Sequence, residues 1–173
     1  NRDGSLDLFW NTGSHTVTWV MDGTAVANQI TSPGNGYDLV ALADFDGDGD
    51  DDAVFRKPAV SSTLMWEYED GQRVAEHTLR RVSEFWTIAD SHDYDQDGIA
   101  DLLWVGRDGR TGFWFMEGPA EDLRWTRRAA SHWAPLESRD VNDDGRLDLL
   151  WDTGHGTTAW VMDGTEVVRS LTI

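Results

Sequence analysis

Hydrophobic and polar residues alternate in short stretches along the whole chain. Residues 16–21 read Thr-Val-Thr-Trp-Val-Met, which is typical of an extended strand with one apolar face. Residues 148–151, Asp-Leu-Leu-Trp, form a shorter apolar run of the kind found in buried strands. Asp22 and Gly23 follow the first stretch and form a hairpin turn signal. No segment shows the period of an amphipathic helix, so the pattern predicts an all-β protein.

These stretches belong to a repeat. When Asn1, Asp46, Asp95 and Asn142 are taken as equivalent, the spacings between them are 45, 49 and 47 residues. The repeats divide a single predicted domain, residues 1–173, into units of about 1–43, 44–92, 93–139 and 140–173. The first and fourth units are the most alike, because residues 3–26 and 144–167 are identical at 16 of 24 positions without a gap.

Each unit carries about four short strands, which matches one blade of a β-propeller. The predicted fold is therefore all-β, with four propeller-type blades of about four antiparallel strands each. The chain begins after the lead-in strand of its first unit, so 15 strands are expected. We expect a ring that is either incomplete or completed by another chain, because an unpaired strand edge is a template for association.

The tryptophans follow the same period. Nine of the ten recur at equivalent positions, which favours a role in the core, since repeats bury equivalent positions alike. Trp125 is the exception and lies in a polar stretch, residues 121–128. It is the predicted ligand-binding residue, with local packing as the alternative.

Composition narrows the classes of function. The chain has a formal charge of −18, from 32 acidic and 14 basic residues, and such a surface repels nucleic acid and anionic membranes. It contains no run of about 18 apolar residues, so no membrane span is predicted. Cysteine is absent, which excludes disulfides and Cys-based metal sites. Ten Trp, six Phe and three Tyr favour a packed protein over a disordered acidic one.

Much of the negative charge lies in an Asp-rich loop that occurs once in each unit, with the pattern Asp-x-Asp/Asn-x-Asp-Gly-x-x-Asp. Carboxylates at alternate positions converge when the backbone curls, and all-oxygen ligands favour Ca²⁺ over zinc or copper. The predicted side-chain ligands are Asp44, Asp46, Asp48 and Asp52, then Asp93, Asp95, Asp97 and Asp101, then Asp140, Asn142, Asp144 and Asp148. A backbone carbonyl near each of Asp50, Ile99 and Arg146 is expected to add one oxygen. A fourth, incomplete site comprises Asn1, Asp3 and Asp7.

The alternative is that these loops are Asp/Gly turns without a metal. Four carboxylates in one loop repel one another, however, and a bound cation removes that cost. The recurrence of the whole loop in register favours the metal site.

The loop followed by a Leu-Leu-Trp strand resembles the FG-GAP/VCBS-type repeat, with the closest match over residues 93–104. The resemblance covers nearly the whole chain and implies blades of a β-propeller with calcium in a loop between two strands, as in integrin α heads and secreted bacterial surface proteins. Such propellers usually have seven blades, whereas four units are found here. Dockerin and thrombospondin type 3 loops share part of the motif, but the first lead into helices and the second are Cys-rich.

Two functions remain open. The first is an extracellular or cell-surface, secreted structural subunit that assembles with copies of itself into a layer, fibre or matrix. The second is a lectin-like or adhesive module that binds a glycan or a surface protein. An enzyme is not expected, because the Asp residues that might form a glycosidase pair belong to the repeat and the five His residues form no recognisable motif.

Overall fold

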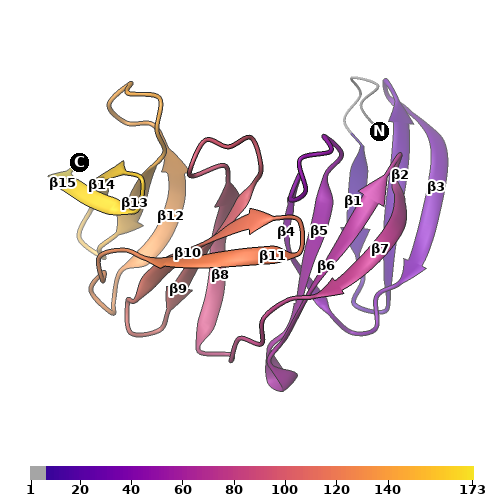
Figure 1. Cartoon of the computed structure of the whole chain (residues 1–173), viewed down its shortest axis with the longest axis horizontal. Helices are drawn as coiled ribbons and strands as arrows, with labels where there is room; N and C mark the ends of the chain where they lie inside the picture. Colours follow the sequence, from indigo (N-terminus) through magenta and orange to yellow (C-terminus); the bar gives the residue numbers. More distant parts are fainter. Residues whose placement is uncertain (1–6) are drawn as a thin grey trace. The chain divides into compact units, whose positions relative to one another are not determined.

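The computed structural model describes residues 7–173 and shows an all-β protein with four small antiparallel sheets (Figure 1). The predicted fold class is confirmed to that extent. Within the described residues there are 15 strands, as expected, and a single 3₁₀ turn at Pro58–Val60. No helix in this part of the chain is long and apolar enough to cross a membrane.

The chain divides into two compact units, Asn1–Glu84 and Phe85–Ile173, each containing two sheets. In the N-terminal unit, sheet I has the strand order β1-β2-β3 and sheet II the order β4-β5-β6-β7. The bounds of sheet I are β1 Leu8–Asn11, β2 His15–Asp22 and β3 Ala25–Pro33. The bounds of sheet II are β4 Asp38–Ala43, β5 Asp52–Lys57, β6 Ser62–Glu69 and β7 Gln72–Thr78.

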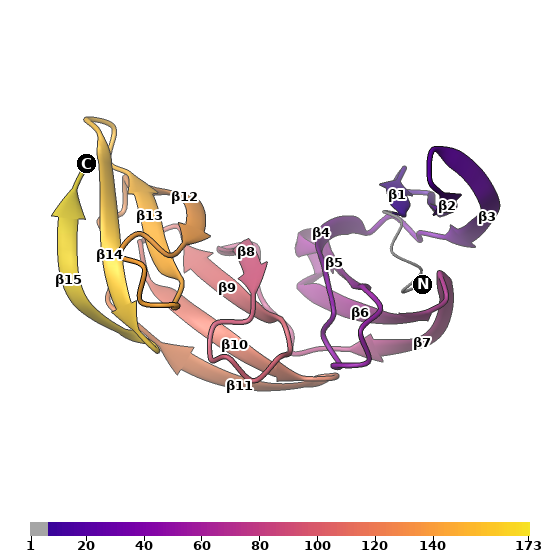
Figure 2. The ribbon, with the colours of Figure 1, turned by 90° about the horizontal axis from the view of Figure 1, so that it is seen from above.

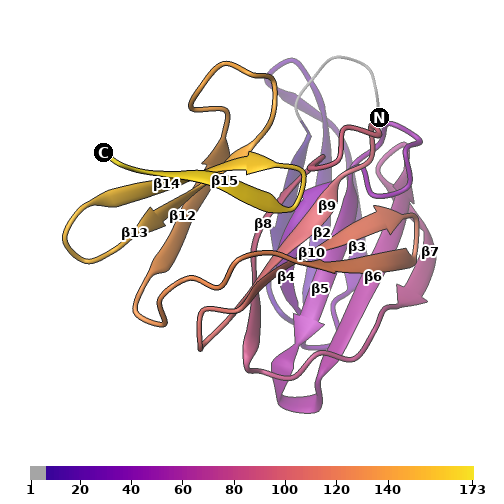
Figure 3. The same ribbon diagram turned by 60° about the vertical axis from the view of Figure 1, so that its left-hand side comes forward.

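In the C-terminal unit, sheet III contains β8 to β11 and sheet IV contains β12 to β15, again with sequential neighbours paired (Figures 2 and 3). The bounds of sheet III are β8 Trp86–His92, β9 Asp101–Gly106, β10 Thr111–Glu117 and β11 Ala120–Trp125. The bounds of sheet IV are β12 Ala134–Arg139, β13 Asp148–Asp152, β14 Thr157–Asp163 and β15 Glu166–Thr172. Whether the chain is one repeat domain, as the sequence predicts, stays a prediction.

The repeats are visible in the irregularities of the sheets. Each lead-in strand (β4, β8 or β12) has a register shift where it pairs with the next strand. The last hairpin of each repeat turns at a Gly with positive φ, at Gly23, Gly71, Gly118 and Gly164 (59°, 74°, 62° and 59°). The turn signal at Asp22 and Gly23 predicts the first of these turns. Only glycine enters this region without strain. The same local sequence therefore produces the same turn four times.

Each of the two compact units has its own aromatic core. In the N-terminal unit, Phe55, Trp66 and Tyr68 of sheet II form a buried cluster against which Phe9 of sheet I packs. In the C-terminal unit, Trp151 and Trp160 of sheet IV pack in one cluster with buried side chains of the neighbouring sheet, such as Leu103 and Phe113. The core predicted for the periodic tryptophans is confirmed for five of them, which are buried: Trp66, Trp104, Trp114, Trp151 and Trp160.

Candidate metal centres

The three complete Asp loops occupy the same place in three sheets. Loop A (residues 44–52) joins β4 to β5, loop B (residues 93–101) joins β8 to β9, and loop C (residues 140–148) joins β12 to β13. Each loop begins directly after the lead-in strand, and its last Asp is the first residue of the next strand. The incomplete fourth site is only partly visible, because Asn1 and Asp3 lie outside the described residues.

Two left-handed backbone positions curl each loop. The Gly of the motif has a positive φ in all three loops, at Gly49, Gly98 and Gly145. The residue two places earlier is also left-handed, although it is a different residue in each loop: Gly47, Gln96 and Asp143. The first of these positions is always Gly, which enters the left-handed region without strain, whereas the sequence gives no signal for a positive φ at Gln96.

The side chain of the first Asp in each loop accepts hydrogen bonds from backbone N–H groups of the same loop. In loop A, the Asp44 carboxylate accepts hydrogen bonds from the backbone N–H groups of Gly47 (2.6 Å) and Gly49 (2.8 Å). Asp93 and Asp140 accept the equivalent bonds from Gly98 (2.9 Å) and Gly145 (2.8 Å). The loops are therefore held in a curled form by their own carboxylates.

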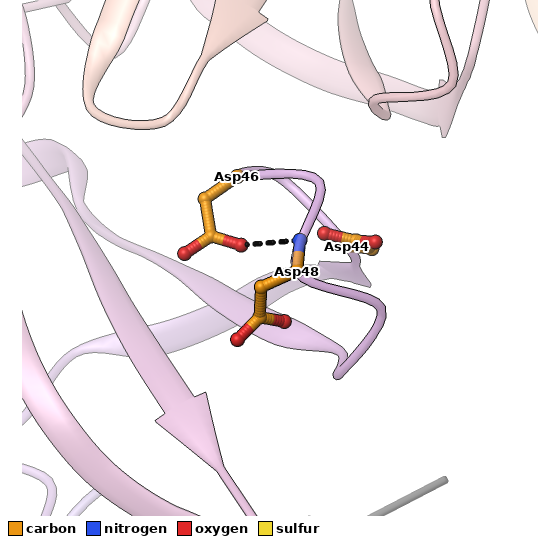
Figure 4. Close-up of side chains that lie close together, drawn as sticks. All are labelled: Asp44, Asp46 and Asp48. Carbon is orange, nitrogen blue, oxygen red and sulfur yellow. Dashed lines mark hydrogen bonds between the residues drawn. The ribbon is translucent and has the colours of Figure 1, made fainter.

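This curl brings acidic side chains together. In loop A, one carboxylate oxygen from each of Asp44, Asp46 and Asp48 lies within 4.8 Å of the other two. Figure 4 shows these three side chains around the turn, with the backbone N–H of Asp48 donating to Asp46 at 3.0 Å. In loop B, a triad of the same size is formed by Asp93, Asp95 and Asp101. Both triads have the geometry to hold a metal ion.

The other predicted ligands are placed differently. Asp52 of loop A and Asp97 of loop B lie outside these triads. In loop C the second Asp is replaced by Asn142, whose amide oxygen accepts a bond from the N–H of Asp144 at 3.1 Å. Asp50 is one of the residues predicted to offer a backbone carbonyl. Its side chain accepts a hydrogen bond from the N–H of Asp70 at 2.8 Å, which tethers loop A to the β6–β7 turn.

The last Asp of each loop is completely buried and acts as a clamp. Asp52, Asp101 and Asp148 have no exposed surface. Each carboxylate accepts one N–H from its own loop, donated by Phe45, Tyr94 or Val141. Its other oxygen accepts an N–H from the far end of the next hairpin, donated by Tyr68, Met116 or Met162 at 2.9–3.0 Å. Asp7 accepts the equivalent bond from Met21 at 2.8 Å. This second partner is not predictable from the motif.

Burial makes two of these carboxylates, Asp52 and Asp101, costly to ionise without a cation. It raises the pKa of Asp52 and of Asp101 to about 7, although the N–H bonds oppose the shift and neighbouring loop carboxylates add to it. Burial also raises the pKa values of Asp46 and Asp95, and repulsion from nearby Asp residues adds to each shift. In contrast, the N–H bond from Gly145 lowers the pKa of Asp140. A cation beside these groups would favour the charged forms.

The clamp should be important for stability. We expect Asp148→Ala to lower the free energy of unfolding by about 2–5 kcal/mol, because the part-buried N–H of Val141 and the buried N–H of Met162 lose their acceptor. The measurement is urea denaturation in calcium. Asp122→Ala is the control, since the Asp122 side chain is exposed and forms a surface ion pair with Arg124. Equal effects of the two substitutions would contradict the clamp.

Trp125 lies outside the metal loops, at the end of β11. Its side chain is 53% exposed and its ring lies 5.3 Å from that of Trp86. A Cβ at Gly112, the facing position on β10, would come within 2.9 Å of the Trp125 ring, so the absence of a side chain there makes room for it. The Arg110 guanidinium lies over Trp86 at 5.1 Å. Trp125 thus belongs to a partly exposed aromatic surface on sheet III.

No protein-family profile matches the chain, and no curated protein matches it either. The FG-GAP/VCBS resemblance therefore rests on the loops, the strand order and the repeat spacing.

Proposed function

We propose that this chain is a non-enzymatic, extracellular calcium-binding repeat protein that serves as a structural subunit of a self-assembling surface layer, fibre or matrix. The observation that carries the proposal is the convergence of loop carboxylates, in the Asp44, Asp46 and Asp48 triad and again in the Asp93, Asp95 and Asp101 triad.

Calcium is the cation that suits these groups best. The ligands offered are all oxygen, and no cysteine exists to favour a softer metal. Calcium accepts six to eight oxygens in flexible geometry, whereas magnesium demands a small octahedral shell that a single loop supplies poorly. Backbone N–H bonds to Asp44 and Asp93 curl the loops, which lowers the ordering cost of binding.

The placement of the loops supports membership of the FG-GAP/VCBS type of repeat. Each complete loop joins a lead-in strand to the next strand of a four-stranded antiparallel sheet. Four strands per unit and calcium between two of them are what that resemblance implies. On this proposal, the four sheets are propeller-type blades.

A structural role fits the chemistry of the loops better than catalysis does. The buried Asp residues are each occupied by two backbone N–H groups, which leaves them poorly suited to transfer protons to a substrate. Their repetition in equivalent places instead suggests that calcium rigidifies each unit. Millimolar extracellular calcium would be enough for loops of modest affinity.

We expect calcium to control the size of the particle. The chain, which has a mass of 19.4 kDa, should form larger particles in millimolar calcium and return to a monomer after chelation. Sedimentation velocity in the two conditions measures this directly. Magnesium at the same concentration is the control for ionic strength, because the loops should bind it weakly. A monomer in all three conditions would reject self-assembly.

A second function is supported by the exposed Trp125 beside Trp86. Aromatic faces of this kind stack on sugars, so a glycan-binding or adhesive module is the alternative. Binding of the monomeric chain to a glycan array, lost in Trp125→Ala, would favour this alternative over assembly.

A further inference from the structure

A side chain joins loop B directly to loop C. Gln96, the left-handed residue of loop B, donates a hydrogen bond from its side-chain amide to the backbone carbonyl of Gly145 at 2.6 Å. Gly145 is the motif glycine of loop C, 49 residues further along the chain. The bond therefore connects two candidate metal centres that belong to different sheets of the same compact unit.

This bond belongs to a chain of hydrogen bonds between the first carboxylates of the two loops. The backbone N–H of Gln96 donates to Asp93 at 2.6 Å, within loop B. The N–H of Gly145 donates to Asp140 at 2.8 Å, within loop C. Gln96 and Gly145 are thus each held by the first Asp of their own loop, and they also hold each other.

Tyr94 of loop B forms a second link. Its N–H donates to Asp101 of the same loop at 2.9 Å, and its hydroxyl lies 2.7 Å from the Oγ atom of Ser138. Ser138 is buried in β12, two residues before Asp140, and its N–H donates to Asp90 of β8 at 2.9 Å. Loop B therefore also contacts the strand that leads into loop C.

Loop A has neither linking group. The residues equivalent to Tyr94 and Gln96 are Phe45 and Gly47 in loop A, which lies in the other compact unit. Phenylalanine has no hydroxyl and glycine has no side chain, so loop A cannot form either link from these positions. The chain thus contains one loop that serves as an internal reference for the linked pair.

Both links require loop B to be curled. Gln96 has a φ of 67°, which is uncommon for a residue other than glycine, so its hydrogen bonds offset an unfavourable backbone conformation. In an empty loop the carboxylates repel one another and favour opening. A cation in one loop keeps that loop curled and its linking atoms in place. The second cation then binds a loop that is already partly ordered, which lowers the entropic cost of binding.

We propose that loops B and C bind calcium cooperatively, with Gln96 and Tyr94 as the positioning residues that couple them. The inference rests on the proposed calcium binding and adds its regulation. Coupling is reciprocal, so each occupied loop should raise the affinity of the other by the same factor. We expect a factor of about five, near the lower end of the usual range, because the Gln96 bond is exposed to solvent.

A calcium titration followed by NMR can measure each loop separately. The N–H groups of Gly49, Gly98 and Gly145 report on loops A, B and C, since each donates to the first Asp of its own loop. Asp144→Asn removes one charged ligand from loop C. In this variant we expect the calcium dissociation constant of loop B to rise about fivefold. The dissociation constant of loop A should stay unchanged.

The matched control uses the residues of loop A. The double variant Tyr94→Phe, Gln96→Gly gives loop B the residues that loop A has at these positions and leaves every predicted side-chain ligand in place. Glycine takes a positive φ without strain, so loop B should keep its own curl. In this background Asp144→Asn should leave the dissociation constant of loop B unchanged. The charge lost from loop C is the same in both backgrounds, so its electrostatic effect cancels.

The outcomes separate this inference from the proposed function. Calcium binding at all three loops, with loop B indifferent to Asp144→Asn, would overturn the coupling and leave calcium binding standing. Equal effects of Asp144→Asn in the two backgrounds would show that Tyr94 and Gln96 do not carry the coupling. Glycine signals that calcium does not move in any of the three loops would overturn the coupling and the proposed calcium binding together.

Discussion

Calcium should raise the free energy of unfolding of this chain by about 8 kcal/mol when its concentration is roughly 100 times the dissociation constant at all three complete loops. A ligand that binds only the folded state stabilises it by mass action, and each independent site contributes about 2.7 kcal/mol under these conditions. Urea denaturation in calcium and after chelation measures the difference. Unchanged stability would contradict calcium binding by the folded loops.

The two compact units should respond unequally. The N-terminal unit contains one complete loop and the C-terminal unit contains two. Calcium should therefore raise the free energy of unfolding by about 3 kcal/mol in the N-terminal unit and about 5 kcal/mol in the C-terminal unit. If the units unfold separately, Trp fluorescence should show two transitions that calcium moves by different amounts. Asp46→Asn and Asp95→Asn are matched variants, since each removes one charge from a triad in a different unit. Each should reduce the calcium response of its own unit alone.

The strands, the turns and the loop positions were predictable because each depends on residues close together in the sequence. Residues 16–21 lie in β2 and residues 148–151 lie in β13, as their apolar patterns predict. The hairpin glycines take the positive φ that the turn signals indicate. The number of strands follows from the repeat, since one unit predicts the next.

The clamp was not predictable, because it depends on contacts between distant residues. Asp101 lies 15 residues before Met116, and the register of the intervening hairpin decides which N–H group reaches its carboxylate. Sequence reasoning gave the last Asp a single role as a ligand. The structure adds a second role, in which the same carboxylate ties the loop to the end of the next hairpin.

Burial was the least predictable property. Trp10 and Trp151 occupy equivalent positions of the repeat, and each ring lies against a second Trp ring, yet only Trp151 is buried. Local sequence sets the sheet and the direction of each side chain. Whether a face is covered depends on what packs against the sheet, and that is not encoded in the repeat itself.

The pH dependence of stability should reverse sign when calcium is removed. In the chelated protein, burial raises the folded-state pKa of Asp52 and Asp101 to about 7, above the usual 3.8. A carboxyl whose pKa is higher in the folded state than in the unfolded state stabilises the fold fully at pH values below its unfolded-state pKa. This contribution is lost as pH rises through the folded-state pKa of about 7. We expect the chelated protein to lose about 2 kcal/mol for each of these carboxyls between pH 5 and pH 8.

The other groups with shifted pKa values do not oppose this loss of stability with rising pH. The pKa values of Asp46 and Asp95 are also raised, and that of His92 is raised by its hydrogen bond with Asp90. The carboxyls with lowered pKa values lose their contribution only as pH falls below the usual 3.8, and they are Asp90, Asp108 and Asp140. Between pH 5 and pH 8 the chelated protein should therefore become steadily less stable.

Calcium should invert this slope, because it binds the ionised loops and protons compete with it. In millimolar calcium we expect stability to increase from pH 5 to pH 8. Urea denaturation at four pH values, with calcium and with chelator, tests both slopes. The double variant Asp52→Asn, Asp101→Asn removes the two titrating carboxyls and should flatten the slope of the chelated protein. Parallel slopes with and without calcium would show that these buried carboxylates are not linked to the metal.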